Sequence, residues 1–213
     1  MPGYLRYVAP RTLPPILLLS ALVATAFPGC GWLSKTSRTT PSAKPHTAAK
    51  PPAISVADNL FVEGMTALRE GRHERALELF SAAWQEKPGH TGVALEFDGA
   101  LLALEKNGDA AYAQGKWEDA GKRWMGTLRF ITHPAANSGG YPFTRSGVRA
   151  KVDRLSEALT EKALTEYRRG EIPAAIADWK TILSYDPAHE EAARSLRTAS
   201  KQLETLKRMP PGK

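Results

Sequence analysis

The stretch that decides the fold is EGMTALREGRHERALELFSAAWQEKPGH, residues 63–90. Gly71 stands in its middle, Pro88 stands near its end, and apolar residues recur at helical spacing between them. Glycine readily ends a helix in the left-handed conformation, and proline does not continue one. The stretch therefore predicts two helices joined by a tight turn. Ala76 would be small where the helices approach, and Phe80 would be the large side chain packed between them.

The same pattern returns twice along the chain. The three sets are Gly64, Gly71, Ala76, Phe80, Ala83 and Pro88; then Gly108, Gly115, Ala120, Trp124 and Thr127; then Ala163, Gly170, Ala175, Trp179, Ile182 and Pro187. An internal repeat of this kind indicates an array of supersecondary units. No convincing alternation of apolar and polar residues follows Val56, so we expect an all-α body over 56–208 and a disordered tail over 209–213.

This spacing resembles the tetratricopeptide repeat, a 34-residue helix–turn–helix unit. The matching windows are 57–90, 101–134 and 156–189, about half of the chain. The second window lacks the final proline, and the third has Ala163 in place of the first glycine. The resemblance implies a short, irregular solenoid of stacked helical hairpins.

Sequence between the windows predicts extended first helices. One should run from about 92 to 114, and another from about 147 to 169 with Ser146 as its cap. Between them, residues 133–143 (HPAANSGGYPF) have the composition of a loop.

A last helix should follow Asp186, the expected cap, and Pro187, the expected first helical residue, and reach about Arg208. Its apolar residues are Ala192, Leu196, Ala199, Leu203 and Leu206. One apolar stripe opposite a charged face is typical of a terminal capping helix. The alternative is a short coiled-coil seam for dimerisation.

The N-terminus has the pattern of an export signal. Arg6 and Arg11 precede an apolar run, ILLLSALVATAF, over residues 16–27, which suits a signal-peptide core and is short for a membrane span. Residues 24–26, Ala-Thr-Ala, would permit ordinary secretory cleavage. An uncleaved anchor is a further alternative.

Cys30 favours a different processing route. The residues before it, Phe27-Pro28-Gly29, resemble the lipobox of bacterial lipoproteins, although Phe27 and Pro28 depart from the usual residues. The resemblance implies a lipoprotein signal peptide over 1–29 and lipidation of Cys30. Gly31, which follows in place of aspartate, implies by the same resemblance the periplasmic face of the outer membrane.

Residues 30–55 read as a disordered tether between membrane and body. Their Ser, Thr, Pro, Ala and Lys content buries too little surface to fold, and the prolines favour an extended chain. Residues 1–56 carry six basic and no acidic side chains, so nearly all of the net charge of +7 lies outside the body. A nucleic-acid function, which needs positive charge on the folded surface, is not expected. Attraction of the tether to an anionic cell-wall polymer is an alternative to a plain spacer.

No catalytic motif is recognisable in the sequence. It has no nucleophile elbow, no phosphate-binding glycine loop and no zinc-protease motif, and its single cysteine lies in the export segment. The five histidines are too far apart in sequence to suggest a metal site. We expect no enzyme activity, cofactor, metal or small-molecule substrate, although catalytic groups from distant positions could converge into a cryptic enzyme.

The leading hypothesis for function is an envelope-anchored protein-interaction scaffold that supports assembly of a pilus, a secretion system or another envelope complex. The alternative is an accessory factor for a cell-wall enzyme. Tetratricopeptide arrays hold partners on a concave face lined by the first helices. By that resemblance the binding residues would be Phe61, Met65, Leu68, Arg69, Asp109, Tyr112, Leu164, Tyr167 and Arg168. Aromatic, Met and Arg side chains are favoured in interface cores. The alternative is that these side chains are core or plain surface.

Overall fold

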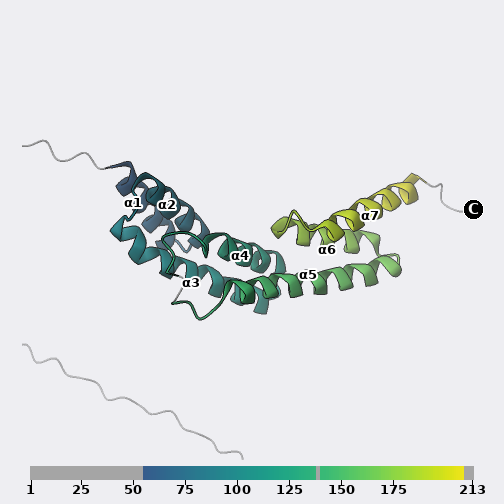
Figure 1. Cartoon of the computed structure of the whole chain (residues 1–213). Coiled ribbons are helices and arrows are strands. Elements are labelled where there is room, and N and C mark those ends of the chain that lie inside the picture. Colours follow the sequence, from purple (N-terminus) through teal and green to yellow (C-terminus); the bar gives the residue numbers. More distant parts are fainter. Residues whose placement is uncertain (1–54, 138–139, 209–213) are drawn as a thin grey trace, which may run out of the picture. The chain divides into compact units, whose positions relative to one another are not determined.

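The computed structural model of this protein describes residues 55–137 and 140–208, which contain seven α-helices and no strand. The helices are α1 (Val56–Arg69), α2 (His73–Glu86), α3 (Thr91–Ala113), α4 (Trp117–Phe130), α5 (Arg145–Arg168), α6 (Ile172–Tyr185) and α7 (Glu190–Arg208). Consecutive helices pair into three hairpins, α1–α2, α3–α4 and α5–α6, and α7 packs on α6 (Figure 1). The described body is a short all-α solenoid of helical hairpins.

All three hairpins turn by the same backbone device. Gly71, Gly115 and Gly170 have φ values of 73°, 70° and 83°, the left-handed region that glycine adopts without steric cost. In the first turn, the amide of Gly71 donates to Leu68 O (3.0 Å) and that of Arg72 to Ala67 O (2.9 Å). Equivalent pairs of bonds close the other two turns. This is the Schellman arrangement, which satisfies the last carbonyl groups of the first helix.

Large aromatic side chains pack against small residues inside each hairpin. A Cβ atom at Gly64 would lie 2.5 Å from Phe80 Cε1, and one at Gly108 would lie 2.6 Å from Trp124 Cδ1. Both rings therefore need a bare glycine backbone opposite them. Trp179 is the buried ring of the third hairpin, where Ala163 takes the glycine position and is also buried. The predicted packing roles of these aromatic residues are confirmed.

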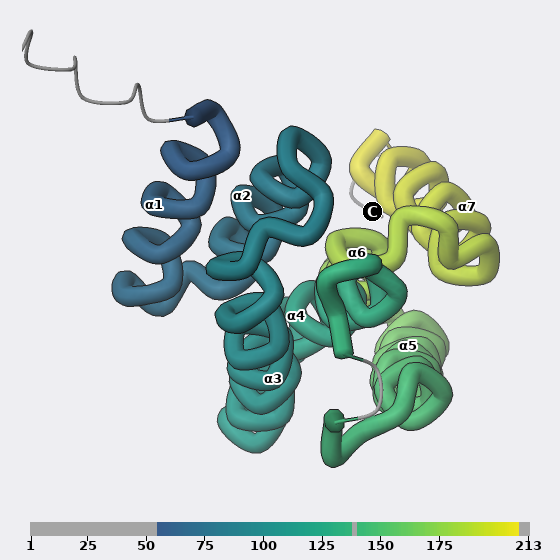
Figure 2. The backbone as a smooth tube through the Cα atoms, turned by 60° about the vertical axis from the view of Figure 1, so that its left-hand side comes forward, coloured from purple at the N-terminus to yellow at the C-terminus, as the bar shows by residue number. Residues whose placement is uncertain are grey.

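Each hairpin contacts the next in two ways. Its second helix packs on the first helix of the following hairpin, and the second helices also contact each other. Helix α2 packs on α3, α4 on α5, and α4 also on α6 (Figure 2). The last contact depends on Gly121, where a Cβ atom would lie 2.4 Å from the Tyr185 ring. A larger residue at position 121 would force α6 away from α4.

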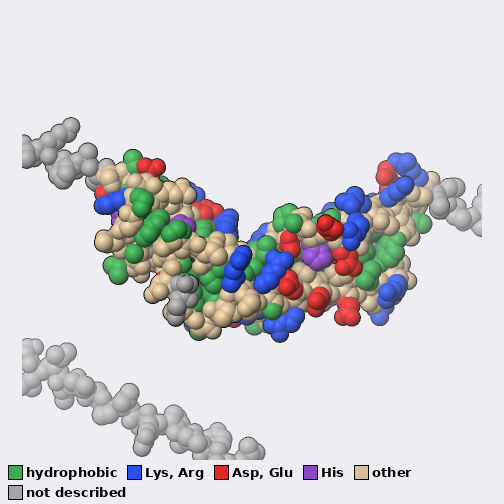
Figure 3. Space-filling view, in the orientation of Figure 1, with side chains coloured by type: hydrophobic (Ala, Val, Ile, Leu, Met, Phe, Trp, Pro, Cys, Tyr) green, Lys and Arg blue, Asp and Glu red, His purple; other side chains and the backbone are tan. Residues whose placement is uncertain are grey.

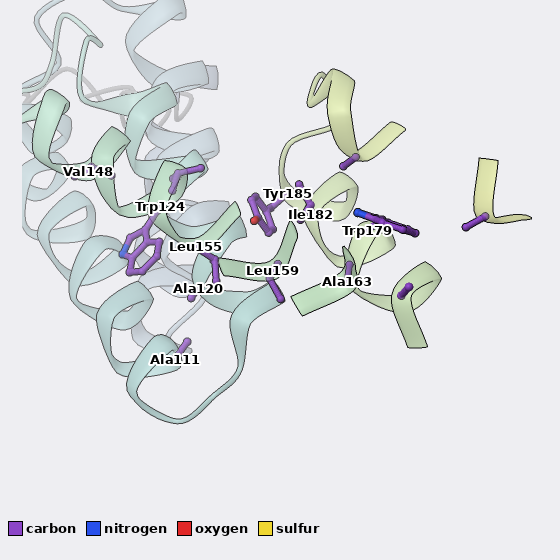
Figure 4. Close-up of a cluster of buried hydrophobic side chains, with 14 of the residues drawn as sticks. Ala111, Ala120, Trp124, Val148, Leu155, Leu159, Ala163, Trp179, Ile182 and Tyr185 are labelled. Atoms are coloured by element: carbon purple, nitrogen blue, oxygen red, sulfur yellow. The ribbon is translucent and has the colours of Figure 1, made fainter. Parts of the chain in front are cut away.

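The buried side chains form two core clusters. The N-terminal cluster centres on Phe80, Phe97 and Phe130, and the C-terminal cluster on Trp124 and Trp179. In Figure 4, Tyr185 and Ile182 lie between the two tryptophans of the C-terminal cluster. Phe143, in the loop before α5, packs against both clusters.

Asp98 on α3 holds that loop by hydrogen bonds. Its carboxylate accepts from the amide of Asn137 (2.9 Å) and from the hydroxyl of Tyr141. Burial, with this hydrogen bond, raises the pKa of Tyr141 well above its ordinary value. The described residues of 133–143 contain no helix, as their composition predicted.

Two predicted helix caps are wrong. Thr144, not Ser146, caps α5, because its Oγ1 accepts from the amide of Gly147 at 3.0 Å. Asp186 and Pro187 do not begin α7: Asp186 is the C-cap of α6, with φ −126° and ψ 81°, and Pro187 lies in the turn that follows. Helix α7 begins at Glu190, where His189 Nδ1 accepts from the amide of Ala192 (3.2 Å).

Helix α7 covers the end of the solenoid, as its apolar stripe predicted. Ala192 and Ala199 are buried in the C-terminal cluster, and Leu196 and Leu203 pack against it. Across the described ranges, no helix has the length and apolar character needed to cross a membrane. The predicted signal peptide, Cys30, the tether apart from Ser55, and the C-terminal tail lie outside the described residues.

Candidate functional site

A small pocket opens where α3, α4 and α5 meet. It has a volume of about 270 Å³ and is lined by Asp109, Tyr112, Trp124, Lys151 and Arg154. We call it the Tyr112 pocket. It unites two residues that the sequence predicted, Asp109 and Tyr112, with three that it did not assign to binding.

Aromatic rings form the apolar part of this pocket. Tyr112 lies in the last turn of α3, three residues before the Gly115 turn, and its ring centre is 5.5 Å from that of Trp124. Trp124 is 3% exposed, whereas Tyr112 is 49% exposed. The pair therefore offers a fixed indole beneath an accessible phenol. Aromatic surface of this kind gives large contact area with little loss of side-chain entropy.

A network of charged groups fixes one wall. The Trp124 Nε1–H donates to Asp109 (3.0 Å), and the Lys151 ammonium donates to Asp109 (2.6 Å) and to buried Glu105. Lys151 Nζ also lies 5.7 Å from the centre of the Trp124 ring. Burial alone lowers the pKa of Lys151, but its hydrogen bonds to both carboxylates outweigh this effect and hold the pKa above its ordinary value.

Arg154 supplies accessible positive charge at the same pocket. Its Nε–H donates to the carbonyl of Ala150 (3.1 Å) on its own helix. Within the described residues Arg154 forms no ion pair. The pocket therefore combines an aromatic surface with one uncommitted guanidinium group.

The equivalent tyrosine of the third hairpin is bonded to α7 and is less exposed. Tyr167 lies 5.9 Å from Trp179, as Tyr112 does from Trp124, but its hydroxyl donates to Gln202 on α7. Leu164 replaces the aspartate of the second hairpin. As a result, the buried Trp179 Nε1 has no hydrogen-bond partner in the described part of the chain.

In the first hairpin the predicted residues contribute mainly to packing. Phe61, Met65 and Leu68 are partly buried against the N-terminal cluster, and the Phe61 ring lies 5.7 Å from Phe80. Arg69 is exposed and donates to the carbonyl of Met65 (3.2 Å). In the third hairpin, Leu164 and Arg168 line a separate hollow on α5. The predicted residues thus lie on three helices, and only Asp109 and Tyr112 share the Tyr112 pocket.

Sequence reasoning missed Lys151 and Arg154 because both precede the third repeat window. A signal was present: Glu105 and Asp109 stand four residues apart on one predicted first helix, and a basic pair stands three apart on the next. It also missed the two capping histidines. His90 and His189 each follow a proline by two residues, and each accepts an amide hydrogen of the following helix through Nδ1.

The chemistry of the Tyr112 pocket suits non-covalent binding. Its lining includes no serine, threonine or cysteine, and its one carboxylate, Asp109, is paired with Lys151. Nowhere in residues 55–137 and 140–208 do three His, Cys, Asp or Glu side chains come close enough to hold a metal ion.

A scan against protein-family models found no match for this chain, and a search of curated protein sequences found none either.

Proposed function

We propose that this protein is an envelope-anchored scaffold of the tetratricopeptide type that holds a partner protein at the Tyr112 pocket. The repeat assignment is supported by three glycine turns with the same bonds and by aromatic residues at one repeated position. The main support for a binding function is the composition of the Tyr112 pocket. It offers Tyr, Trp and Arg side chains together, the types in which interface energy concentrates.

The contrast between hairpins supports this choice of site. Tyr167 is partly buried and its hydroxyl donates to Gln202 on α7, whereas Tyr112 keeps about half of its surface exposed. A large aromatic side chain half exposed beside an uncommitted arginine suits burial against a partner. The partner that fits presents an apolar side chain to the rings.

Photocrosslinking in intact cells tests the site. A photoreactive phenylalanine analogue at Tyr112 should capture a protein that mass spectrometry identifies. The same analogue at the exposed Ser200 on α7 is the control. Identical captured proteins from both positions, or none from Tyr112, would count against the pocket. The identity of the captured protein separates an assembly scaffold from an accessory factor for a cell-wall enzyme.

Anchoring through Cys30 is a separate part of the proposal. It rests on the position of the only cysteine directly after the apolar run. A lipidated cysteine carries several acyl chains, enough for stable membrane attachment. Radiolabelled palmitate should enter the wild type and not the Cys30→Ala variant. Equal labelling of the two would exclude lipidation at this residue.

A further inference from the structure

A second concave feature lies between α5 and the start of α7. This α5–α7 cleft has a volume of about 610 Å³. Its lining residues are Asp153, Ser156, Glu157, Thr160, Glu161, Leu164, His189 and Glu191. Figure 3 shows acidic side chains gathered around a histidine over this part of the body. No lysine or arginine is among the residues that line the cleft.

The spacing of the cleft carboxylates on α5 is unfavourable for helix stability. Asp153, Glu157 and Glu161 succeed one another at four-residue intervals on one face of α5, a spacing at which like charges destabilise a helix. Asp153 pairs with Arg149 at 3.1 Å. Within the described residues, Glu157, Glu161 and Glu191 form no ion pair. Three uncompensated carboxylates therefore border one cleft.

Thr160 gives an independent indication of a ligand. It lines the cleft and is 8% exposed, and its hydroxyl oxygen is buried without a hydrogen-bond partner in the described part of the chain. Nearby Ser156, on the same helix, does have a partner, the hydroxyl of Tyr185 at 2.9 Å. Buried hydroxyl groups are normally paired. The oxygen itself has almost no accessible surface, so a donor from the cleft would supply the bond that Thr160 lacks once neighbouring side chains move aside.

We infer that the α5–α7 cleft binds a cationic segment of a partner protein, with lysine or arginine side chains placed among these carboxylates. This inference rests on the proposed scaffold function and names the chemistry of a second contact. Leu164 offers apolar surface for the aliphatic stem of such a side chain. A metal ion fits less well, because no three acidic or histidine side chains in the described body converge on one point.

The distribution of charge along the chain bears on this binding. Residues 1–56 carry nearly all of the formal charge of +7, so the folded body is close to neutral and binding of a cationic segment depends on a local negative field. Such binding should weaken as salt screens the carboxylates. It should not depend on the aromatic residues of the Tyr112 pocket.

The test measures fluorescence anisotropy of a labelled ten-residue peptide containing four lysines and three leucines, with the full chain in detergent micelles. We expect saturable binding at low salt. The double change Glu157→Gln with Glu161→Gln should raise Kd by about fivefold or more. The matched control changes Glu63 and Glu86 to Gln on α1 and α2; it removes the same charge and should leave Kd unchanged.

Two further variants keep the test independent of folding and of the Tyr112 pocket. Thr160→Val should weaken binding without lowering the melting temperature, because it removes an unpaired hydroxyl and keeps the shape. Tyr112→Ala should leave the peptide Kd unchanged. Absence of binding to the full chain, or equal weakening by the cleft and control pairs, would overturn the inference. Neither result would affect crosslinking from Tyr112.

Discussion

The second and third hairpins place the same two aromatic residues in different surroundings. In the second, the Trp124 indole N–H bonds to Asp109, and Tyr112 stands half exposed beside Lys151 and Arg154. In the third, Leu164 leaves the Trp179 N–H without a described partner, and α7 holds the equivalent tyrosine. One repeat position can therefore be bonded to a neighbouring helix in one hairpin and accessible in another, as binding would require. The surroundings of the tyrosine depend on the helix that follows each hairpin: α5 for the second and α7 for the third.

The largest expected effect is the loss of either tryptophan. Trp124→Ala and Trp179→Ala each remove a nearly fully buried indole, so each should lower the free energy of unfolding by about 3–5 kcal/mol. Chemical denaturation followed by circular dichroism measures this. Trp117→Ala, at a partly exposed indole, is the control and should cost less. Equal costs at all three positions would contradict the repeat alignment.

The two tyrosines should respond in opposite ways. Tyr167→Ala removes packing and the bond to Gln202, so it should cost about 1–3 kcal/mol of stability and leave partner recovery intact at low temperature. Tyr112→Ala should cost less than about 1 kcal/mol and abolish partner recovery. Pulldown from solubilised membranes, with thermal melting alongside, separates the effects. A large loss of stability from Tyr112→Ala would show that this ring is core.

Replacing each tryptophan with phenylalanine isolates the indole N–H. Trp124→Phe leaves Asp109 without one of its donors, whereas Trp179→Phe removes a buried donor that has no described partner. We expect Trp124→Phe to be the more destabilising by about 1 kcal/mol. Both changes lose similar volume, so the difference between their midpoints in denaturant reports the hydrogen bond. The reverse order would mean that Trp179 is satisfied in solution.

The weakest effect that we expect is a pH dependence of stability from His133, which packs on the N-terminal cluster. His133 stacks on Phe97 with ring centres 4.7 Å apart, and burial lowers its pKa below the ordinary value. A lowered folded-state pKa means that the unfolded chain binds the proton more readily. The contribution of His133 is thus complete above about pH 6.5 and is lost as pH falls toward the folded-state pKa.

The His133→Phe variant should therefore show a shallower fall of melting temperature between neutral and mildly acidic pH. His73 shares the direction of the effect, since burial also lowers its pKa, so some slope should remain. An unchanged slope in the variant would mean that His133 is solvated in the folded protein.

Much of the fold could be predicted because it depends on residues near one another in sequence. Gly71, Gly115 and Gly170 act through bonds within five residues, and their spacing to the aromatic positions follows from helix geometry. The start of α7 was missed because Asp186 serves the helix before it rather than the helix after it. A capping residue recognised in the sequence does not show whether it ends one helix or begins the next.

The candidate site was only half predictable for a physical reason. Asp109 and Tyr112 follow from repeat position, but Lys151 and Arg154 reach them from α5, about forty residues further along the chain. That contact depends on how α5 lies along α3 and α4, which no local pattern specifies. The bond from Tyr167 to Gln202 on α7 is likewise a tertiary effect.

On the proposed function, the Tyr112 pocket holds a partner and the equivalent position of the third hairpin does not. Photocrosslinking from Tyr112 and, in parallel, from Tyr167 in the full chain in cells tests it most directly. We expect one captured protein from position 112, lost when Arg154 is changed to Ala, and no such product from position 167. Capture of the same protein from position 167 alone, or from neither position, would contradict it.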